Sequence, residues 1–296
     1  EIRFCDWSSD VCSSDLSIEI TLVVLLAAML NAGWNALIKV SGDRIAVMAM
    51  VTLLGSALSS LALPFVEMPD PASWPLLALA ILLHTAYHFI LPVAYNYGDL
   101  GQVYPIARGS APLLVTFGAA VFAGEVLDSV PLWGVICLAV GVMALSFDRR
   151  TGLTRNPRAV LFALGTGVCI AAYTLIDGLG ARQAGSVLGF AVCLTIGDGL
   201  LTFLIAVVWK AKAIAKVARE ALSPAMLAGG MQVGAYWIAV WALAHAPLGM
   251  VSALRETSVL FAAVISTFIL KEGFGVWRFV SAGLIVCGIG LTRYKR

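Results

Sequence analysis

The chain has 296 residues, of which 60% are hydrophobic and only 12% are charged. A soluble domain carries roughly 25% charged residues because water must wet its surface, so these values exclude a soluble globular protein. A net charge of +2 with no basic stripe argues against a nucleic-acid partner. The solvent for most of this chain is therefore expected to be the lipid bilayer.

Residues 1–16 differ in character from everything that follows. Residues 6–16 (DWSSDVCSSDL) can be encoded by a nucleotide string that resembles a common short-read sequencing adapter. The segment also lacks the apolar run of a signal peptide. We interpret residues 1–16 as an assembly artefact and leave Cys5 and Cys12 out of the fold prediction.

Ten apolar windows follow, separated by turn and charge signals. A helix needs about 20 mostly apolar residues to cross a hydrocarbon core of about 30 Å. Backbone groups inside lipid must bond internally, so the windows predict an all-α integral membrane fold and not an open sheet. The windows are residues 18–40, 44–66, 74–97, 103–123, 131–148, 157–179, 186–209, 223–245, 249–270 and 275–292.

One connection between windows is unusually long. Residues 210–221 (KAKAIAKVAREA) alternate Lys and Arg with Ala, Ile and Val. The pattern is compatible with a short amphipathic helix on the membrane surface or with a solvated connector. The connector is the favoured interpretation.

The chain repeats itself. Arg108 precedes Glu125 by 17 residues, and Arg255 precedes Glu272 by the same interval. Each Arg lies early in an apolar window and each Glu closes that window. We therefore predict two five-helix repeats, residues 17–148 and 157–296, joined by a basic linker at residues 149–156. An odd number of crossings makes the two repeats antiparallel, as in secondary transporters that bind substrate at the repeat interface.

Three sequence features carry a family resemblance. Residues 31–36 (NAGWNA), residues 104–109 (YPIARG) and the closing pairs Gly124–Glu125 and Lys271–Glu272 resemble the EamA family of the drug/metabolite transporter superfamily. The resemblance covers residues 18–292. It implies ten helices as two inverted five-helix repeats around a central cavity, and many family members export amino acids or other metabolites. The second half departs from the family pattern, because Lys271 replaces the Gly and no YPIAR string precedes Arg255.

The first window carries a polar stripe. Asn31, Asn35 and Lys39 are spaced four residues apart beside Trp34, so they share one helical face. Such a stripe avoids lipid, and it therefore lines a cavity or a contact between helices. We favour the cavity.

Two histidines lie one turn apart in the third window. His84 and His88 have the spacing of metal ligands, but a metal site needs three or four ligands and no HExxH motif is present. We expect no metal, and assign the pair, with Tyr87, to packing or to a cavity wall. The cysteines inside the apolar windows have no CxxC spacing and are interpreted as packing residues.

Two arginines occupy equivalent places in the two repeats. A guanidinium matches a carboxylate or phosphate, so Arg108 is a candidate for recognising an anionic substrate group. Pro105 and Gly109 are expected to break the helix around it. For Arg255, an internal ion pair with its neighbour Glu256 is the favoured interpretation. For both arginines the alternatives are snorkelling towards the interface or pairing with an acidic side chain such as Glu256 or Asp177.

An acidic residue lies near the middle of the seventh window. Asp198 is flanked by Gly197 and Gly199, which predict a kink and close backbone approach. A carboxylate inside a membrane is expensive, so it is expected to carry a proton, to bind a cationic group or to partner a polar side chain nearby.

The eighth window adds aromatic candidates. Tyr236 and Trp237 lie near Gln232 and can stack on a substrate or close a gate, whereas Trp241 is assigned to the membrane interface. The complete set of substrate-binding or cavity candidates is Asn31, Trp34, Asn35, Lys39, His84, Tyr87, His88, Tyr104, Arg108, Tyr173, Asp177, Asp198, Gln232, Tyr236, Trp237, Arg255 and Glu256.

Two rules disagree about orientation. Loops after odd-numbered windows hold most of the Lys and Arg, so the positive-inside rule places both termini outside. The family resemblance implies cytoplasmic termini, and we follow it.

These observations predict a multi-pass secondary transporter of the bacterial inner membrane. It is expected to export a small polar organic metabolite, such as an amino acid, by alternating access about a cavity lined by helices one, three, four, six, eight and nine. No P-loop is present, so the energy is expected to come from an ion gradient or from the gradient of the substrate itself, with protons as the candidate coupling ion and no cofactor. The alternatives are an intramembrane enzyme acting on lipid-linked substrates and a structural or sensory subunit. Scattered polar residues and the lack of a GxSxG or HExxH motif argue against an enzyme.

Overall fold

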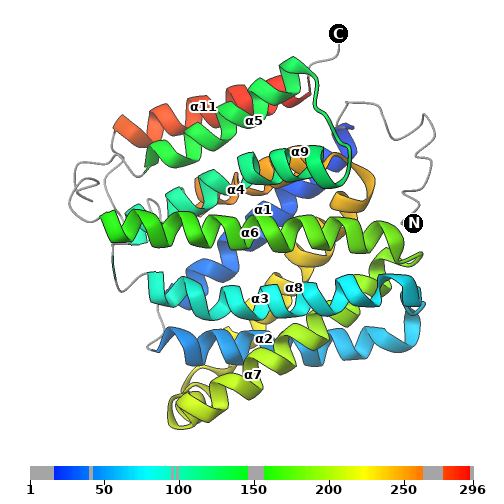
Figure 1. The fold of residues 1–296 in the computed structure, drawn as a ribbon. Coiled ribbons are helices and arrows are strands. Elements are labelled where there is room, and N and C mark those ends of the chain that lie inside the picture. The colour runs from blue at the N-terminus through cyan, green and yellow to red at the C-terminus, as the bar shows by residue number, and fades with distance from the viewer. Residues whose placement is uncertain are drawn as a thin grey trace.

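The computed structural model describes residues 17–39, 43–94, 97, 100–145, 157–262 and 276–293, and within these ranges it contains helices and no strand (Figure 1). The predicted artefact at 1–16, the linker at 149–156 and Glu272 lie outside them. The helices are α1 (Ile18–Lys39), α2 (Arg44–Ala62), α3 (Trp74–Ala94), α4 (Leu100–Phe122), α5 (Ser129–Ala144), α6 (Pro157–Gln183), α7 (Val187–Glu220), α8 (Leu222–His245), α9 (Leu248–Arg255) and α11 (Val276–Thr292), with 3-10 turns at Leu63–Phe65 and Pro71–Ser73.

The helices have the length and composition of membrane spans. Seven of those in the described ranges are long and apolar enough to cross a bilayer, and α5 and α11 are shorter apolar helices. The predicted all-α membrane fold is confirmed. The window predicted at 249–270 is not one regular helix, because α9 ends at Arg255 and a turn follows at Glu256 and Thr257. The Thr257 hydroxyl donates a hydrogen bond to the carbonyl of Leu254 there.

Helix contacts follow the symmetry expected of two inverted repeats. We call α1–α5 the first half and α6–α11 the second half. The second helices of the two halves, α2 and α7, pack along one another, and so do the fifth helices, α5 and α11. The contact of α1 with α8 is matched by that of α6 with α3. In Figure 1 the pairs α2–α7 and α5–α11 lie at opposite edges of the molecule.

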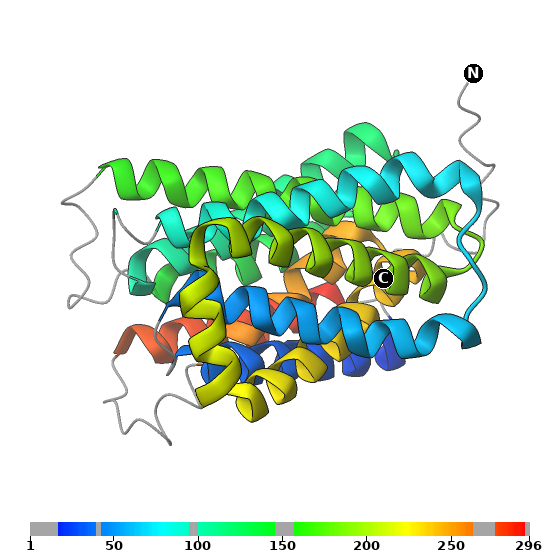
Figure 2. The same ribbon diagram turned by 90° about the horizontal axis from the view of Figure 1, so that it is seen from below.

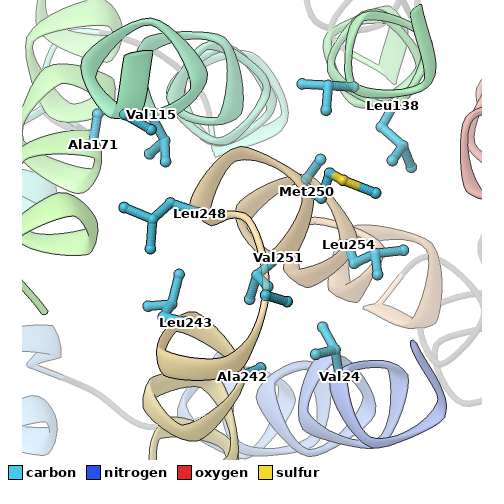
Figure 3. Close-up of a cluster of buried hydrophobic side chains, with 14 of the residues drawn as sticks. Val24, Val115, Leu138, Ala171, Ala242, Leu243, Leu248, Met250, Val251 and Leu254 are labelled. Atoms are coloured by element: carbon cyan, nitrogen blue, oxygen red, sulfur yellow. The ribbon is translucent and has the colours of Figure 1, made fainter. Parts of the chain in front are cut away.

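The short helix α9 forms the centre of the largest apolar core. Its residues from Leu248 to Leu254 are all buried. Figure 3 shows its side chains surrounded by those of other helices, including Val24 of α1, Val115 of α4 and Leu138 of α5. Side chains of both halves therefore pack on the same eight-residue helix.

The helix α7 bends at Lys210, whose backbone φ and ψ of −130° and 22° are not helical. Beyond the bend the chain remains helical to Glu220 and turns across one end of the bundle, beside α2 and α8 (Figure 2). Ile214 and Val217 pack into the apolar cluster of α2 and α8, while Lys212 and Lys216 are exposed. The structure thus corrects the connector interpretation, because this segment is an amphipathic helix packed on the bundle.

Candidate functional site

A cavity of about 90 Å³ lies between the two halves. Eight helices supply its wall, including α2 and α7, which the predicted set of lining helices omitted. The structure gathers these predicted candidates around it: Asn31, Trp34, His84, Tyr87, His88, Arg108, Tyr173, Asp198, Gln232, Tyr236 and Arg255. The wall also contains residues that were not predicted: Ala27, Ala28, Thr52, Leu194, Thr195, Val233 and Ala235.

The remaining candidates do not line this cavity. Asp177, Glu256, Tyr104 and Trp237 contact lining residues from behind, as described below. Asn35 turns back on its own helix, and the Lys39 side chain lies outside the described part of the chain. Among the residues missed, Thr195 is three residues before Asp198 and shares its helical face. The other missed residues have no sequence signal, because alanine, valine, leucine and threonine are common in every apolar window.

His84 links the cavity to a deeply buried carboxylate. Its Nε2 lies 2.9 Å from Oδ2 of Asp177 on α6, and Asp177 is fully buried. The hydroxyl of Tyr236 on α8 is 3.5 Å from the same nitrogen, and the ring of Tyr173 lies 4.1 Å from the imidazole centroid. No donor among the described residues reaches Asp177 Oδ1. The pair is therefore surrounded by aromatic side chains, and the His84 imidazole and Tyr236 both line the cavity beside it.

A second histidine–carboxylate pair lies one turn further along α3. His88 Nδ1 is 3.4 Å from Oδ1 of Asp198 on α7. The same oxygen accepts hydrogen bonds from the hydroxyls of Thr85, at 3.1 Å, and Thr202, at 3.2 Å. The Asp198 carboxylate is thus held by side chains of α3 and α7 acting together.

The glycines beside Asp198 do not kink the helix, which corrects the prediction for this segment. The only non-helical backbone inside α7 is at Lys210. Instead, Gly199 lets α2 approach so closely that an added Cβ would overlap the Ser56 hydroxyl and the Thr52 carbonyl. Ser56 uses this approach to donate hydrogen bonds to the α7 carbonyls of Thr195 and Ile196. The glycines serve helix packing.

Arg108 is part of a buried ion pair that crosses the halves. Its Nη1 lies 3.1 Å from Oε1 and 3.4 Å from Oε2 of Glu256, and both side chains are almost fully buried. The guanidinium carbon is 5.3 Å from the centroid of the Tyr104 ring. The helix was expected to break around Arg108, but α4 runs through Pro105 and Pro112 without interruption.

Arg255 does not pair with Glu256 as predicted, because Glu256 turns to Arg108. Adjacent residues on a helix point in directions about 100° apart, so neighbours in sequence are poorly placed to meet. Arg255 lines the cavity instead. Within the described part of the chain no carboxylate lies within ion-pair distance of it. Of the two arginines in the cavity wall, Arg108 is therefore paired with a glutamate, and Arg255 has no such partner among the described residues.

The polar side chains of α1 form some of their hydrogen bonds within the helix itself. The indole of Trp34 donates to Oδ1 of Asn31 at 2.9 Å, and the amide of Asn35 donates to the Asn31 carbonyl at 2.8 Å. Trp237 on α8 similarly donates to the Thr195 hydroxyl at 3.1 Å. Asn31 and Trp34 are thus fixed side chains of the cavity wall, whereas Trp237 joins α8 to α7 behind it.

A further ionic cluster lies at one end of the bundle, away from the cavity. Glu125, which follows α4, forms an ion pair with Arg182 of α6. The second carboxylate oxygen accepts the backbone N–H of Leu248, at the N-terminus of α9, at 2.8 Å. Arg182 also donates to the carbonyls of Leu243 and Ala246, at 3.0 and 2.9 Å. We call Glu125, Arg182 and the ends of α8 and α9 that they bond the terminal latch.

Comparison with known proteins supports these observations. Residues 157–294 match the sequence profile of the EamA-like transporter family. A crystal structure of another protein has the same fold, with a TM-score of 0.71 over 92% of this chain and 94% of that chain. Its sequence is 17% identical, so the likeness shows the fold alone. No curated protein sequence matches.

Proposed function

We propose, from the membership of residues 157–294 in the EamA-like transporter family, that this protein exports a small metabolite carrying a carboxylate, such as an amino acid. The chain is a multi-pass membrane transporter of the drug/metabolite type. The substrate, the outward direction and the bacterial inner membrane are the parts that we propose. Protons are the proposed coupling ion, and alternating access between the two halves is the proposed mechanism.

The Arg255 guanidinium, which has no carboxylate within ion-pair distance in the described part of the chain, carries the substrate proposal. A guanidinium offers a planar set of donors that suits a carboxylate, and in the low dielectric of a membrane it gains most from an anionic partner. Arg108 is not equally available, because Glu256 already neutralises it. Arg255 is therefore the group that we assign to the substrate carboxylate.

The cavity wall contains side chains of both charges, which supports a zwitterionic substrate. Asp198 is an acidic residue that lines the cavity, and Arg255 is a basic one. Aromatic rings of Trp34, Tyr87 and Tyr173 complete the wall. A small zwitterion places its carboxylate at Arg255 and its ammonium at Asp198, and the confined volume favours compact solutes.

The position of the cavity supports alternating access. Inverted-repeat transporters bind substrate where the two repeats meet, so that rocking of one half against the other exposes the site to each side in turn. In this chain both halves line the cavity. Each described ion pair near it also joins one half to the other, so rocking of the halves changes the charges that the substrate meets.

A ligand-shift experiment tests the substrate class. Purified protein is heated with each common amino acid, with matched amines lacking the carboxylate and with organic phosphates. A ligand that binds the folded state raises the melting temperature. We expect amino acids to stabilise the wild type, the matched amines to have no effect, and Arg255→Gln to abolish the shift.

Transport of the stabilising solute is then measured in proteoliposomes, with Lys216→Gln on the exposed surface helix as the control variant. Flux in the wild type and control, but not in Arg255→Gln, supports the proposal. Stabilisation by the amines alone would contradict the role of Arg255. Hydrolysis or group transfer on lipid-linked substrates without flux would favour an enzyme.

A further inference from the structure

The two histidine–carboxylate pairs on α3 differ in how their carboxylates are bonded, and this difference separates their roles. We propose that His84 and Asp177 form the site that binds and releases the coupling proton, while Asp198 remains a permanent anion. The inference rests on the proposed proton-coupled transport. It assigns the coupling step to one pair of atoms, His84 Nε2 and Asp177 Oδ2.

Asp198 is built to remain ionised. Its Oδ1 lies within hydrogen-bonding distance of two threonine hydroxyls, Thr85 and Thr202, and close to the His88 ring. Hydrogen bonds donated to a carboxylate stabilise its charged form. Asp198 therefore carries its charge without needing a proton of its own.

Asp177 is bonded differently. It is fully buried, its carboxylate has the His84 ring and the Tyr236 hydroxyl as partners, and no described donor reaches its Oδ1. A neutral imidazole beside this carboxylate leaves a buried net charge of −1. Adding one proton between Nε2 and Oδ2 makes the pair neutral. The protonated pair is therefore the favoured form until a nearby cation neutralises the carboxylate in place of the proton.

Access to water distinguishes the imidazole from the carboxylate. His84 lines the cavity, whereas Asp177 lies behind it. A proton from the cavity therefore reaches Asp177 through Nε2 of His84 and leaves by the same route. An ammonium group that enters the cavity repels this proton, so arrival of the substrate and departure of the proton are linked without any change in covalent bonds.

The surroundings of the pair provide both signs of charge. Arg255, assigned above to the substrate carboxylate, and Asp198, assigned to its ammonium, line the same cavity as His84. A bound carboxylate that neutralises Arg255 thus changes the electrostatic potential at the His84–Asp177 pair. The titratable groups that face the pair are Tyr87, His88, Arg108, Cys169, Tyr173, Asp198, Tyr236 and Arg255.

Imidazole NMR of the full chain tests proton binding without a substrate. The sequence contains three histidines, so His84→Gln and His88→Gln assign the signals and exposed His245 serves as internal reference. We expect Asp177→Asn to move the His84 titration midpoint by about tenfold or more in proton concentration. Asp198→Asn, which leaves the His84–Asp177 pair intact, is the matched control and is expected to move the His84 midpoint by less. An unchanged His84 midpoint in Asp177→Asn overturns the proposal.

If Asp177→Asn does not fold, calorimetry provides a second test, because it measures how many protons the protein takes up. Between acidic and alkaline buffers, the double variant His84→Gln/Asp177→Asn, which lacks both proton acceptors of the pair, is expected to take up fewer protons than the wild type. Equal uptake by the two proteins overturns the assignment.

A pH-sensitive dye inside proteoliposomes tests coupling, with the common amino acids as probes. We expect solute flux to be accompanied by a dye response that Asp177→Asn abolishes. Solute flux with no dye response overturns the proton site and leaves the transport function standing. If no solute moves, the proposed function fails, and the NMR titration still decides whether the pair binds a proton.

Discussion

Glu125 and Arg182 come from different halves of the chain, and their ion pair fixes the N-terminus of α9 through the Leu248 amide. The helix α9 lies in the centre of the largest apolar core and ends beside the cavity at Arg255. The terminal latch therefore positions, through one short helix, the residue that we assign to the substrate. The alternating access that we propose requires the latch to loosen when its end of the bundle opens.

Loss of the latch is expected to destabilise the protein. Arg182→Ala leaves the Glu125 carboxylate largely buried without its cation, and removing one partner of such a pair typically costs about 3–5 kcal/mol. We expect a loss of at least about 3 kcal/mol in unfolding free energy, measured by denaturation in mixed micelles. The matched control is Lys216→Ala, which removes an exposed ion pair with Glu220 and is expected to change stability by less than about 1 kcal/mol. Equal effects would contradict the structural role of the latch.

Arg108 and Glu256 are expected to act as a unit. Arg108→Gln and Glu256→Gln each leave one buried charge unpaired, so each should lower the unfolding free energy by about 3 kcal/mol. The double variant removes both charges, and we expect it to be more stable than the sum of the single effects by about 1–3 kcal/mol. A double-mutant cycle in the same denaturation assay measures this coupling. Strict additivity would show that the two side chains do not depend on one another.

The contact between α2 and α7 is expected to tolerate no side chain at Gly199. A methyl group there meets the backbone carbonyl of Thr52, which cannot move without shifting the helix. Gly199→Ala should therefore cost about 1–3 kcal/mol. Gly165→Ala on α6 meets open space and provides the control. It is expected to leave thermal stability unchanged or to raise it by up to about 1 kcal/mol through helix propensity. A Gly199→Ala protein as stable as the control would refute the close packing.

Acid is expected to weaken the link between the first loop and the bend of α7. The Lys210 ammonium, which hydrogen-bonds Asp43 at 2.8 Å, holds the pKa of this carboxyl below its ordinary value of 3.8. Because the folded-state pKa is the lower one, the stabilisation is complete above pH 3.8 and disappears as the pH falls through the folded-state pKa. Both side chains are partly exposed, so the effect is under about 1 kcal/mol.

Thermal denaturation at several pH values measures this effect. Asp43→Asn is expected to be less stable than the wild type at neutral pH, and the difference should shrink as the carboxyl of the wild type is protonated. Asparagine caps a helix about as well as aspartate, so the variant keeps the bonds accepted from the Ile45 and Ala46 amides and the difference reports the ion pair. A stability difference that grows in acid would contradict the ion pair.

The sequence predicted the helices and much of the cavity wall because both follow from local patterns. Apolar length defines a membrane span, and a charged or polar side chain within it must find water or a partner. Asp198, His84 and Asn31 were recognised as cavity candidates by this reasoning alone. Polar spacing along one helix thus predicts which face turns inward.

The partners of these residues could not be predicted in the same way. His84 and Asp177 are separated by 93 positions, and Arg108 and Glu256 by 148. Such pairs depend on how helices of different halves are placed side by side. Pairing Arg255 with its sequence neighbour was wrong for this reason, and the kink expected beside Asp198 was wrong because the facing helix fills the space that glycine leaves.

The distribution of partners also bears on how the protein is made. His84, Arg108 and Glu125 emerge from the ribosome with the first half, whereas their partners Asp177, Glu256 and Arg182 follow with the second. A first half inserted alone holds these ionisable groups in the bilayer without their counterparts, a state that membrane insertion disfavours. Completion of the first half therefore depends on the arrival of the second, and synthesis that stops between α5 and α6 leaves an intermediate for quality control to recognise.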